Sequence, residues 1–517
     1  YQRKTGEGGD FTLFFIASLP ALGFQQYVFQ SSAPDAAAAA VVAAARSTTT
    51  YNHDQIAAGS AITIENEFNR LTFVNGVLAT WEKKGDGANS STTTSFDVTQ
   101  KFCSYKSSEG DAHSTQRSGA YIFRPQGENG AKEIAVCTPI LNGLLNDKPV
   151  EIYAVIQGES NQIVAQVRQR FSSWLTQTVT LYKGGQEAVF EFTIGEVPFT
   201  ELGTGHEIVS RFTTAIASNG ILLTDSNGRE MMTRKRDFRS KWALNQTERV
   251  AGNYYPCGAA AAIYDDDAQL TVLVDAAQAV GSIHDGELEL MVHRRISKDD
   301  GRGVGEPLDE LQFVTDYASQ PEHGKHFGPG LVIRGRHSVV LSSLKSAGSA
   351  SGTWRPIADA LFSPPLVALR SGGGGGLDAA FTALTAPLPI NVQIMTLQAL
   401  SPSKLLLRLA HQFGIGEDEK FSRPVTIDLA TLFDPTTSDV EIANAREVSL
   451  TNNQNKSAIL KRREDAMGWS SGSDDEEKPH PWRSAVFTWN NMRGAPSPVV
   501  LGPLEIKTFV LDLATKE

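Results

Sequence analysis

The sequence predicts a mainly β protein, in which a large antiparallel β-sandwich is followed by a smaller β-sandwich domain. Short runs rich in β-branched and aromatic residues recur along the chain, with Gly, Asn, Asp or Pro turn signals between them. Several runs alternate apolar and polar residues, as half-buried strands do. Long helical periodicity is nearly absent, which argues against an α/β fold.

The strand-like runs fall into two groups, separated by the glycine-rich segment 371–376. An earlier alanine-rich segment, 33–50, has no amphipathic face that could dock a helix, so we interpret it as a linker. The predicted division is therefore: residues 1–30 as terminal strands of a preceding small β-domain, 31–60 as an Ala-rich linker, 61–365 as the large sandwich, 366–380 as a Gly-rich linker, and 381–517 as the C-terminal small β-domain.

Composition excludes several classes of partner. The net charge of −11 argues against a nucleic-acid or anionic-membrane partner, since both are polyanions. No run is long and apolar enough to span a membrane, and residues 11–24 lack the basic start and cleavage site of a signal peptide. Because the chain opens with Tyr1, we expect a fragment or a processed subunit.

The three cysteines, Cys103, Cys137 and Cys257, allow at most one intrachain disulfide, and the sequence leaves its pairing open. They show no zinc-binding spacing. His323 and His326 lie three residues apart, which is weak evidence for a metal and more typical of loop histidines. The aspartates at 265–267 are interpreted as a turn between strands. No self-contained catalytic motif is present.

The stretch 285–303 combines a predicted strand with a crowded charged end. Alternation from Glu287 to His293 indicates a half-buried strand and, if it continues, places Arg294 on the apolar face and Arg295 on the polar face. The glycines that follow predict a loop. Charged side chains on a loop held by a sheet could bind a ligand, or they could form a solvated ion-pair cluster that contributes little to stability.

Longer motifs resemble the C-terminal β region of glycoside hydrolase family 38, in the branch of the lysosomal or vacuolar acid α-mannosidases. The resemblance covers nearly the whole chain in the family's order, apart from 33–50 and 371–376. The motifs are IASLPALGF (16–24), SGAYIFRP (118–125), TDSNGRE (224–230), RKRDFRSKWALNQTERVAGNYYP (234–256), DGELELMVHRRISKDDGRGVGEPLDE (285–310), RGRHSVVL (334–341) and LRLAHQFGIGED (407–418).

The resemblance implies a galactose-mutarotase-like sandwich and a part of a retaining exo-α-mannosidase that trims α-mannosyl residues from N-glycan-type oligosaccharides. In that family an aspartate nucleophile, a second carboxylate and a zinc ion carry the reaction. They lie in an upstream (β/α) barrel and the helical segment after it, so we expect no catalytic residue and no metal ligand in this chain. The chain alone is predicted to be inactive.

Six residues are candidates for the sugar site by this resemblance. Tyr121 of the SGAY motif and Arg295 of the paired-arginine motif are expected to line the mannose pocket. A phenol can donate to and accept from a sugar hydroxyl, and a guanidinium is a rigid fork of donors. Four charged neighbours are expected to brace Arg295: Arg294, Asp299, Asp300 and Arg302.

Two other functions stay open. One is a freestanding glycan-binding β-sandwich without catalysis, and the other is the corresponding part of a Golgi-type α-mannosidase. The HRR form at His293 favours the lysosomal branch. The resemblance further implies a mannose-containing oligosaccharide and an upstream catalytic domain or subunit as partners, with neither nucleic acid nor membrane. It also implies a homo-oligomeric whole enzyme, located in a lysosome or vacuole or secreted.

Three N-glycosylation sequons occur, at Asn89, Asn245 and Asn455. Asn245 lies in a polar stretch between predicted strands, so it should carry a glycan when the protein passes through a secretory pathway. Mass spectrometry of secreted protein tests this expectation, and unmodified Asn245 throughout the sample would contradict it.

Overall fold

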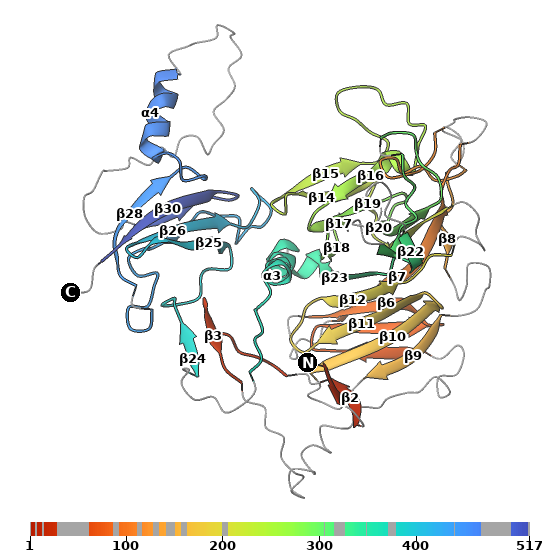
Figure 1. Ribbon diagram of the computed structural model, residues 1–517, viewed down its shortest axis with the longest axis horizontal. Helices are drawn as coiled ribbons and strands as arrows, with labels where there is room; N and C mark the ends of the chain where they lie inside the picture. The colour runs from red at the N-terminus through yellow and green to blue at the C-terminus, as the bar shows by residue number, and fades with distance from the viewer. Residues whose placement is uncertain are drawn as a thin grey trace, which may run out of the picture. The chain divides into compact units, whose positions relative to one another are not determined.

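The computed structural model confirms the mainly β prediction (Figure 1). It divides into two compact units, one of residues 1–16 and 32–366 and the other of 17–31 and 367–517. The structure describes residues 2–5, 8–12, 15–27, 61–85, 93–110, 116–127, 134–140, 150–156, 163–198, 205–303, 305–314, 326–347, 349–370, 379–438, 440–466 and 498–514.

The larger unit contains two nine-stranded antiparallel sheets. The first sheet has the order β15 (Glu230–Lys235), β14 (Ile221–Ser226), β17 (Ala260–Tyr264), β18 (Ala268–Val274), β23 (Ile333–Ser343), β12 (Ala188–Ile194), β11 (Leu175–Tyr182), β10 (Val164–Ser172) and β9 (Glu151–Ile156). The second has the order β16 (Tyr254–Cys257), β19 (Gln278–Gly281), β20 (Glu287–Ile296), β13 (Gly205–Thr214), β7 (Thr93–Lys106), β6 (Val77–Lys84), β5 (Asn69–Val74) and β4 (Ile62–Glu65), with β8 (Thr138–Pro139) beside β7.

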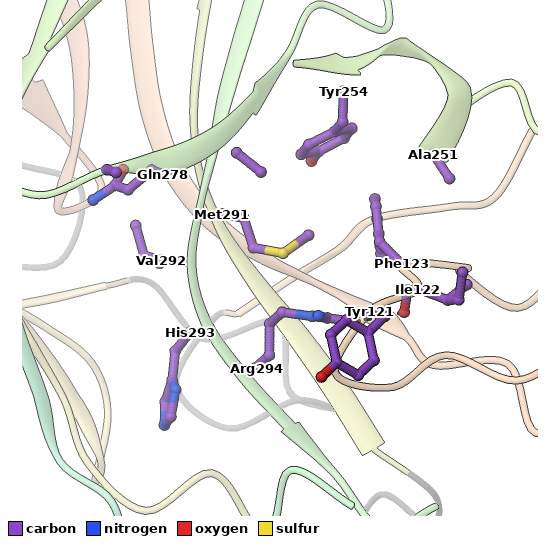
Figure 2. A pocket seen from close by; sticks show the side chains of 12 residues that line it. Tyr121, Ile122, Phe123, Ala251, Tyr254, Gln278, Met291, Val292, His293 and Arg294 are labelled. Atoms are coloured by element: carbon purple, nitrogen blue, oxygen red, sulfur yellow. Dashed lines mark hydrogen bonds between the residues drawn. The ribbon is translucent and has the colours of Figure 1, made fainter. Parts of the chain in front are cut away.

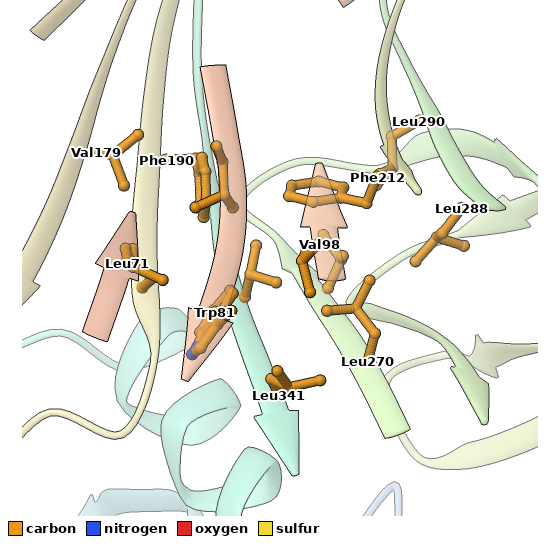
Figure 3. Packing of buried hydrophobic residues seen from close by; sticks show 14 of the residues in the cluster. Leu71, Trp81, Val98, Val179, Phe190, Phe212, Leu270, Leu288, Leu290 and Leu341 are labelled. Carbon is orange, nitrogen blue, oxygen red and sulfur yellow. The ribbon is translucent and has the colours of Figure 1, made fainter. Parts of the chain in front are cut away.

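The two sheets form a sandwich because their inner faces share one hydrophobic core (Figure 3). Trp81 and Phe212 enter this core from the second sheet, and Phe190 and Leu270 enter it from the first. The rings of Phe190 and Phe212 meet edge to face across the gap, with centroids 5.4 Å apart. Each such fully buried side chain contributes roughly 1.5–3 kcal/mol of burial free energy.

A chain of buried glutamines also crosses the sandwich. Gln177 of β11 donates to Gln100 of β7 and to Gln169 of β10, at 2.8 Å each. Gln169 in turn donates to the carbonyl of Gly76 at 2.7 Å. An unpaired buried amide is costly, so these bonds favour one alignment of the two sheets.

Loops cover the outer face of the second sheet, the face that points away from the first. A disulfide joins Cys103 of β7 to Cys137 in the segment 134–140 and settles the pairing that the sequence left open. Cys257 is a buried free thiol. The disulfide belongs to a cluster that also contains Tyr105 and Met291. The segment 134–140 is therefore tied covalently to the sheet beneath it.

The remaining elements of the larger unit are short. Helix α3 (Ser351–Phe362) packs Trp354 against the outer face of the first sheet, on Ala260, Leu273 and Val340. The others are β1 (Gln2–Thr5), β2 (Gly8–Thr12), η2 (Ala251–Asn253), β21 (Leu311–Val314), β22 (His326–Gly330) and α2 (Leu344–Ala347).

The smaller unit has its own core around Leu407, Leu409 and Phe509. Its sheet has the order β25 (Val392–Ser401), β26 (Lys404–His411), β30 (Ile506–Leu513) and β28 (Ile442–Val448), and two-stranded sheets pair β27 (Val425–Ile427) with β29 (Val499–Leu501) and β24 (Ala380–Thr382) with β3 (Gly23–Gln25). Helix α4 is Lys456–Ala466.

The pairing of β3 with β24 joins the N-terminal segment 17–27 to the C-terminal unit, whereas the sequence suggested a separate preceding domain. The predicted linker 31–60 lies outside the described residues, as does 371–378 of the glycine-rich linker. The exact domain boundaries stay predictions. No helix among the described residues is long and apolar enough to cross a membrane.

His337 makes the sandwich sensitive to acid. It is fully buried on β23, with Nε2 2.9 Å from the Oε1 of Gln278, and burial lowers its pKa from 6.5 to about 3. Below pH 6.5 the unfolded chain binds a proton that the folded chain does not, so stability should fall as the pH drops from there toward about 3. His337→Gln should flatten that part of the curve of melting temperature against pH. Curves of identical shape for the two proteins would contradict this.

Candidate functional site

The candidate site is built on the segment 116–127, called here the Tyr121 loop, which lies over the outer face of the second sheet. The loop contains no regular strand, so other elements must hold its backbone. The loop after β20 packs directly against it. A Cβ atom on Gly119 would lie 2.5 Å from the Cβ of Asp300, so only glycine permits the two loops to approach this closely.

Asp300 clamps the Tyr121 loop through backbone bonds. Its Oδ2 atom accepts the N–H of Tyr121 at 2.8 Å and that of Ile122 at 3.2 Å, and its Oδ1 atom accepts the N–H of Arg302 at 2.9 Å. Desolvation acts to raise the pKa of Asp300, but the three N–H donors outweigh it and leave the pKa below its usual value. The carboxylate therefore stays ionised in mildly acidic solution.

Arg294 holds the same loop from the sheet side. Its Nη2 atom donates to Oε1 of Glu207 at 2.6 Å and to the carbonyl of Ile122 at 2.9 Å, and its Nε atom donates to the same Glu207 oxygen at 3.1 Å. Ser118 adds a hydroxyl that donates to that oxygen at 2.6 Å. Desolvation raises the pKa of the fully buried Glu207, against the effect of Arg294 and Ser118.

Arg302 and Asp299 have weaker connections to the loop. The exposed guanidinium of Arg302 donates to Oε1 of Gln116 at 2.9 and 2.7 Å. Asp299 accepts the N–H of Gly301 at 2.8 Å, which is a bond within its own turn. The structure thus brings Arg294, Asp300 and Arg302 to the Tyr121 loop, and gives Asp299 a local bond.

A β-bulge corrects the predicted faces of the two arginines. Along β13, Ile208 pairs with His293 and the next residue, Val209, pairs with Met291, so Val292 has no partner. An extra residue reverses the alternation beyond it. Arg294 therefore lies opposite Glu207 on the outer face. The prediction that Arg294 shares the apolar face and Arg295 the polar face is wrong.

Arg295 instead points to the inner side of its sheet and retains only 8% exposure. Its Nη1 atom donates to the carbonyl of Val197 at 2.6 Å and to Oε1 of Glu196 at 3.1 Å. The guanidinium also packs close to Gly330, where a Cβ atom would lie 2.8 Å from its Cζ. Its acidic partner Glu196 is 47% exposed, so the ion pair ends at the surface.

An open pocket of about 470 Å³ adjoins the Tyr121 loop (Figure 2). Aromatic, small apolar and polar side chains from β19, β20, the Tyr121 loop and the segment 251–254 surround it. Tyr121 is 63% exposed at this pocket, although its backbone is clamped. Arg295 is not part of the lining, which consists of Tyr121, Ile122, Phe123, Ala251, Tyr254, Ala277, Gln278, Ala279, Met291, Val292, His293 and Arg294.

A second buried acid lies near the pocket. Glu289 accepts the hydroxyls of Tyr105 at 2.9 Å and Tyr254 at 2.6 Å, and it pairs with Arg211. Sequence reasoning missed both Glu207 and Glu289. Glu289 fits the polar positions of an alternating strand, and such positions normally face water. Here they face a layer of loops instead.

The remaining candidates have structural explanations or lie elsewhere. Asp265 accepts the N–H groups of Asp267 and Ala268 at 2.9 Å in the turn between β17 and β18, as predicted. His323 and Asn89 lie outside the described residues, whereas Asn245 and Asn455 are exposed. Within the described ranges, no group of three His, Cys, Asp or Glu side chains could hold a metal ion.

Comparison of the sequence with known protein families shows to which family this chain belongs. The model of the glycosyl hydrolases family 38 C-terminal domain matches residues 64–302, which include all six candidate residues. Human lysosomal alpha-mannosidase is 36% identical over 98% of the chain. The chain belongs to the C-terminal region of glycosyl hydrolase family 38.

Other relatives extend the comparison. An alpha-mannosidase from Canavalia ensiformis is 36% identical over 82% of this chain and 40% of its own length. The chain spans 44% of the human relative, so it corresponds to less than half of such proteins. An alpha-mannosidase structure from Enterococcus faecalis V583 aligns with 87% of this chain and 42% of its own, at 14% identity and a TM-score of 0.49.

The Asp300 clamp predicts a pH-dependent loss of stability. Asp300→Asn removes the charge that three N–H groups share and should lower the free energy of unfolding by about 2 kcal/mol. Because the folded pKa lies below the usual 3.8, the difference should be constant above that pH and shrink as the pH falls below it. Urea unfolding of both proteins across this range provides the measurement. Asp299→Asn is the matched control, and an equal loss in both variants would refute the clamp.

Proposed function

We propose that the chain is the C-terminal portion of a retaining exo-α-mannosidase that removes α-mannosyl residues from N-glycan-type oligosaccharides. It completes the sugar pocket of a catalytic barrel that precedes it in the whole protein. The names of the relatives support the activity, and their greater length leaves room for such a barrel.

The observation that carries this proposal is the exposed ring of Tyr121 on a clamped loop. Two carboxylates, Asp300 directly and Glu207 through Arg294, are engaged in holding this loop. Yet the tyrosine side chain is left 63% exposed. Such an arrangement favours ligand affinity, because the backbone of the contact residue is already ordered and loses little further entropy when a ligand binds.

Arg295 is the second proposed sugar contact. Its guanidinium has a fixed backbone acceptor in Val197 and a partly exposed partner in Glu196. The Arg295 guanidinium, whose orientation these bonds fix, would donate a charge-assisted hydrogen bond to a sugar hydroxyl at the surface end of the pair. In this proposal Arg294, Asp299, Asp300 and Arg302 support the site without touching the sugar.

The reaction itself is assigned to residues outside this chain. In the whole enzyme, zinc would bind sugar hydroxyls, but the described residues provide no cluster that fits it. The chain's own part is to bind and orient the mannose ring so that the barrel nucleophile would reach its anomeric carbon and the barrel acid its glycosidic oxygen. A lysosomal location is proposed from the name of the human relative, with a vacuole or secretion as alternatives. Assembly of the whole enzyme into a homo-oligomer is proposed from the family resemblance alone.

The test begins with hydrolysis of an aryl α-mannoside. The pure chain should show none, because the proposal places the nucleophile, the acid and the zinc ligands in the preceding barrel, whereas the complete enzyme from the same gene should be active. Zinc-dependent turnover by the chain alone would contradict the proposal. Binding of mannosides by the chain, with no active longer product from the gene, would favour a freestanding glycan-binding domain.

The paired arginines sharpen the test within the complete enzyme. Arg295→Ala should lower kcat/KM by about one to two decades, the value of a charge-assisted hydrogen bond. Arg294→Ala leaves the buried Glu207 without its cation and should lower the melting temperature first. If Arg295→Ala melts early but keeps full kcat/KM, Arg295 is only a structural ion-pair partner.

A further inference from the structure

One buried oxygen atom holds the Tyr121 loop from the side of the sheet. Oε1 of Glu207 accepts the hydroxyl of Ser118 at 2.6 Å and the guanidinium of Arg294 at 2.6 and 3.1 Å. Glu207 lies on β13 beneath the loop and is fully buried, so it cannot reach the pocket. Neither Glu207 nor Ser118 is among the pocket-lining residues.

The two donors to this oxygen hold the loop on both sides of Tyr121. Before Tyr121, the Ser118 hydroxyl oxygen accepts the backbone N–H of Arg124 at 3.1 Å and so closes the loop on itself. After Tyr121, Arg294 donates to the carbonyl of Ile122 at 2.9 Å. The carboxylate thus fixes the entry and the exit of the segment that presents the phenol.

We propose that Glu207 is a positioning residue for Tyr121. Its carboxylate never touches the sugar, but it sets the place of the phenol through Ser118 and Arg294. This inference rests on the proposed function, in which Tyr121 is a sugar contact. It also implies that the negative charge is needed, because a neutral group would release the guanidinium that holds Ile122.

The burial of Glu207 is explained better by a role in fixing the loop geometry than by a gain in stability. A buried ion pair is rarely a net gain over apolar residues of the same shape, because both ions lose their hydration. Such a pair does fix geometry, since the charged groups accept only one arrangement. Here the geometry that is fixed belongs to a loop that contains no strand and pairs with β7 only at its end, through the bridge between Pro125 and Ser107.

Glu289 is the natural control. It is also fully buried on the outer face of the second sheet, and it also pairs with an arginine, Arg211. Its hydrogen-bond partners are Arg211, Tyr105 and Tyr254, none of which belongs to the Tyr121 loop. Glu289→Gln therefore removes the same charge from the same sheet face without removing a bond to the loop.

Hydrogen exchange on the 517-residue chain tests whether Glu207 holds the Tyr121 loop, and this measurement does not require enzyme activity. Glu207→Gln should speed exchange of the Tyr121 and Ile122 amides about tenfold relative to the unmodified chain, while β7 and β11 keep their protection. Glu289→Gln should leave the two loop amides unchanged. If Glu207→Gln does not fold, Ser118→Ala replaces it. This change removes the hydroxyl that joins the loop to Glu207, together with the bond that the Arg124 N–H donates to it, and leaves the Asp300 bonds to Tyr121 and Ile122 in place. Unchanged loop amides in the folded variant, or equal acceleration in Glu289→Gln, would overturn the proposal.

A double-mutant cycle in the complete enzyme separates positioning from general stability. Glu207→Gln should lower kcat/KM about tenfold. This loss should vanish in the Tyr121→Phe background, because the two changes then affect one contact. Additive losses would show that Glu207 acts on folding alone. Full activity of Tyr121→Phe would instead refute the sugar-contact role of Tyr121, and the exchange measurement would still decide whether Glu207 holds the loop.

Discussion

The site region depends on the bond network around two carboxylates that face a loop instead of water. The Tyr121 loop lies across the outer face of a sheet, contains no strand, and forms a β-bridge with neighbouring backbone only at Pro125. Asp300 accepts hydrogen bonds from two backbone N–H groups of the loop, and Glu207 of the underlying sheet holds the loop through Arg294 and Ser118. Both carboxylates accept several hydrogen bonds, from the loop itself or from side chains that hold it. Removing either carboxylate therefore leaves several donors without an acceptor at once.

The sandwich supplies the rigidity on which this network stands. β13 and β20, which carry Glu207 and Arg294, are neighbours in the interior of the second sheet, and their inner faces bury Phe212, Leu288 and Leu290. The β-bulge at Val292 then turns one arginine outward to the loop and the next one inward. A single unpaired residue thus divides two adjacent guanidinium groups between two sides of one sheet.

Much of this architecture could be predicted from the sequence. Alternation from Glu287 to His293 identified β20, and recurring β-rich runs separated by turn signals indicated the antiparallel sandwich. The motifs located Tyr121 and the charged cluster after β20. The bulge could not be predicted, because Val292 is an ordinary strand residue and no glycine marks the irregularity. Glu207 and Glu289 were missed for another reason: period-two patterns distinguish two faces of a sheet, but not whether a loop covers the polar one.

The disulfide between Cys103 and Cys137 has a consequence for where this chain can be made. It links strand and loop across 34 residues of sequence, and a closure of that size removes roughly 3–4 kcal/mol of entropy from the unfolded chain. Thiols pair in oxidising compartments and stay reduced in the cytosol. In a reducing host Cys103 and Cys137 would stay free thiols, as Cys257 is, and only non-covalent contacts would hold segment 134–140 on the outer face. The choice of expression host therefore decides whether segment 134–140 is linked to β7 by the disulfide.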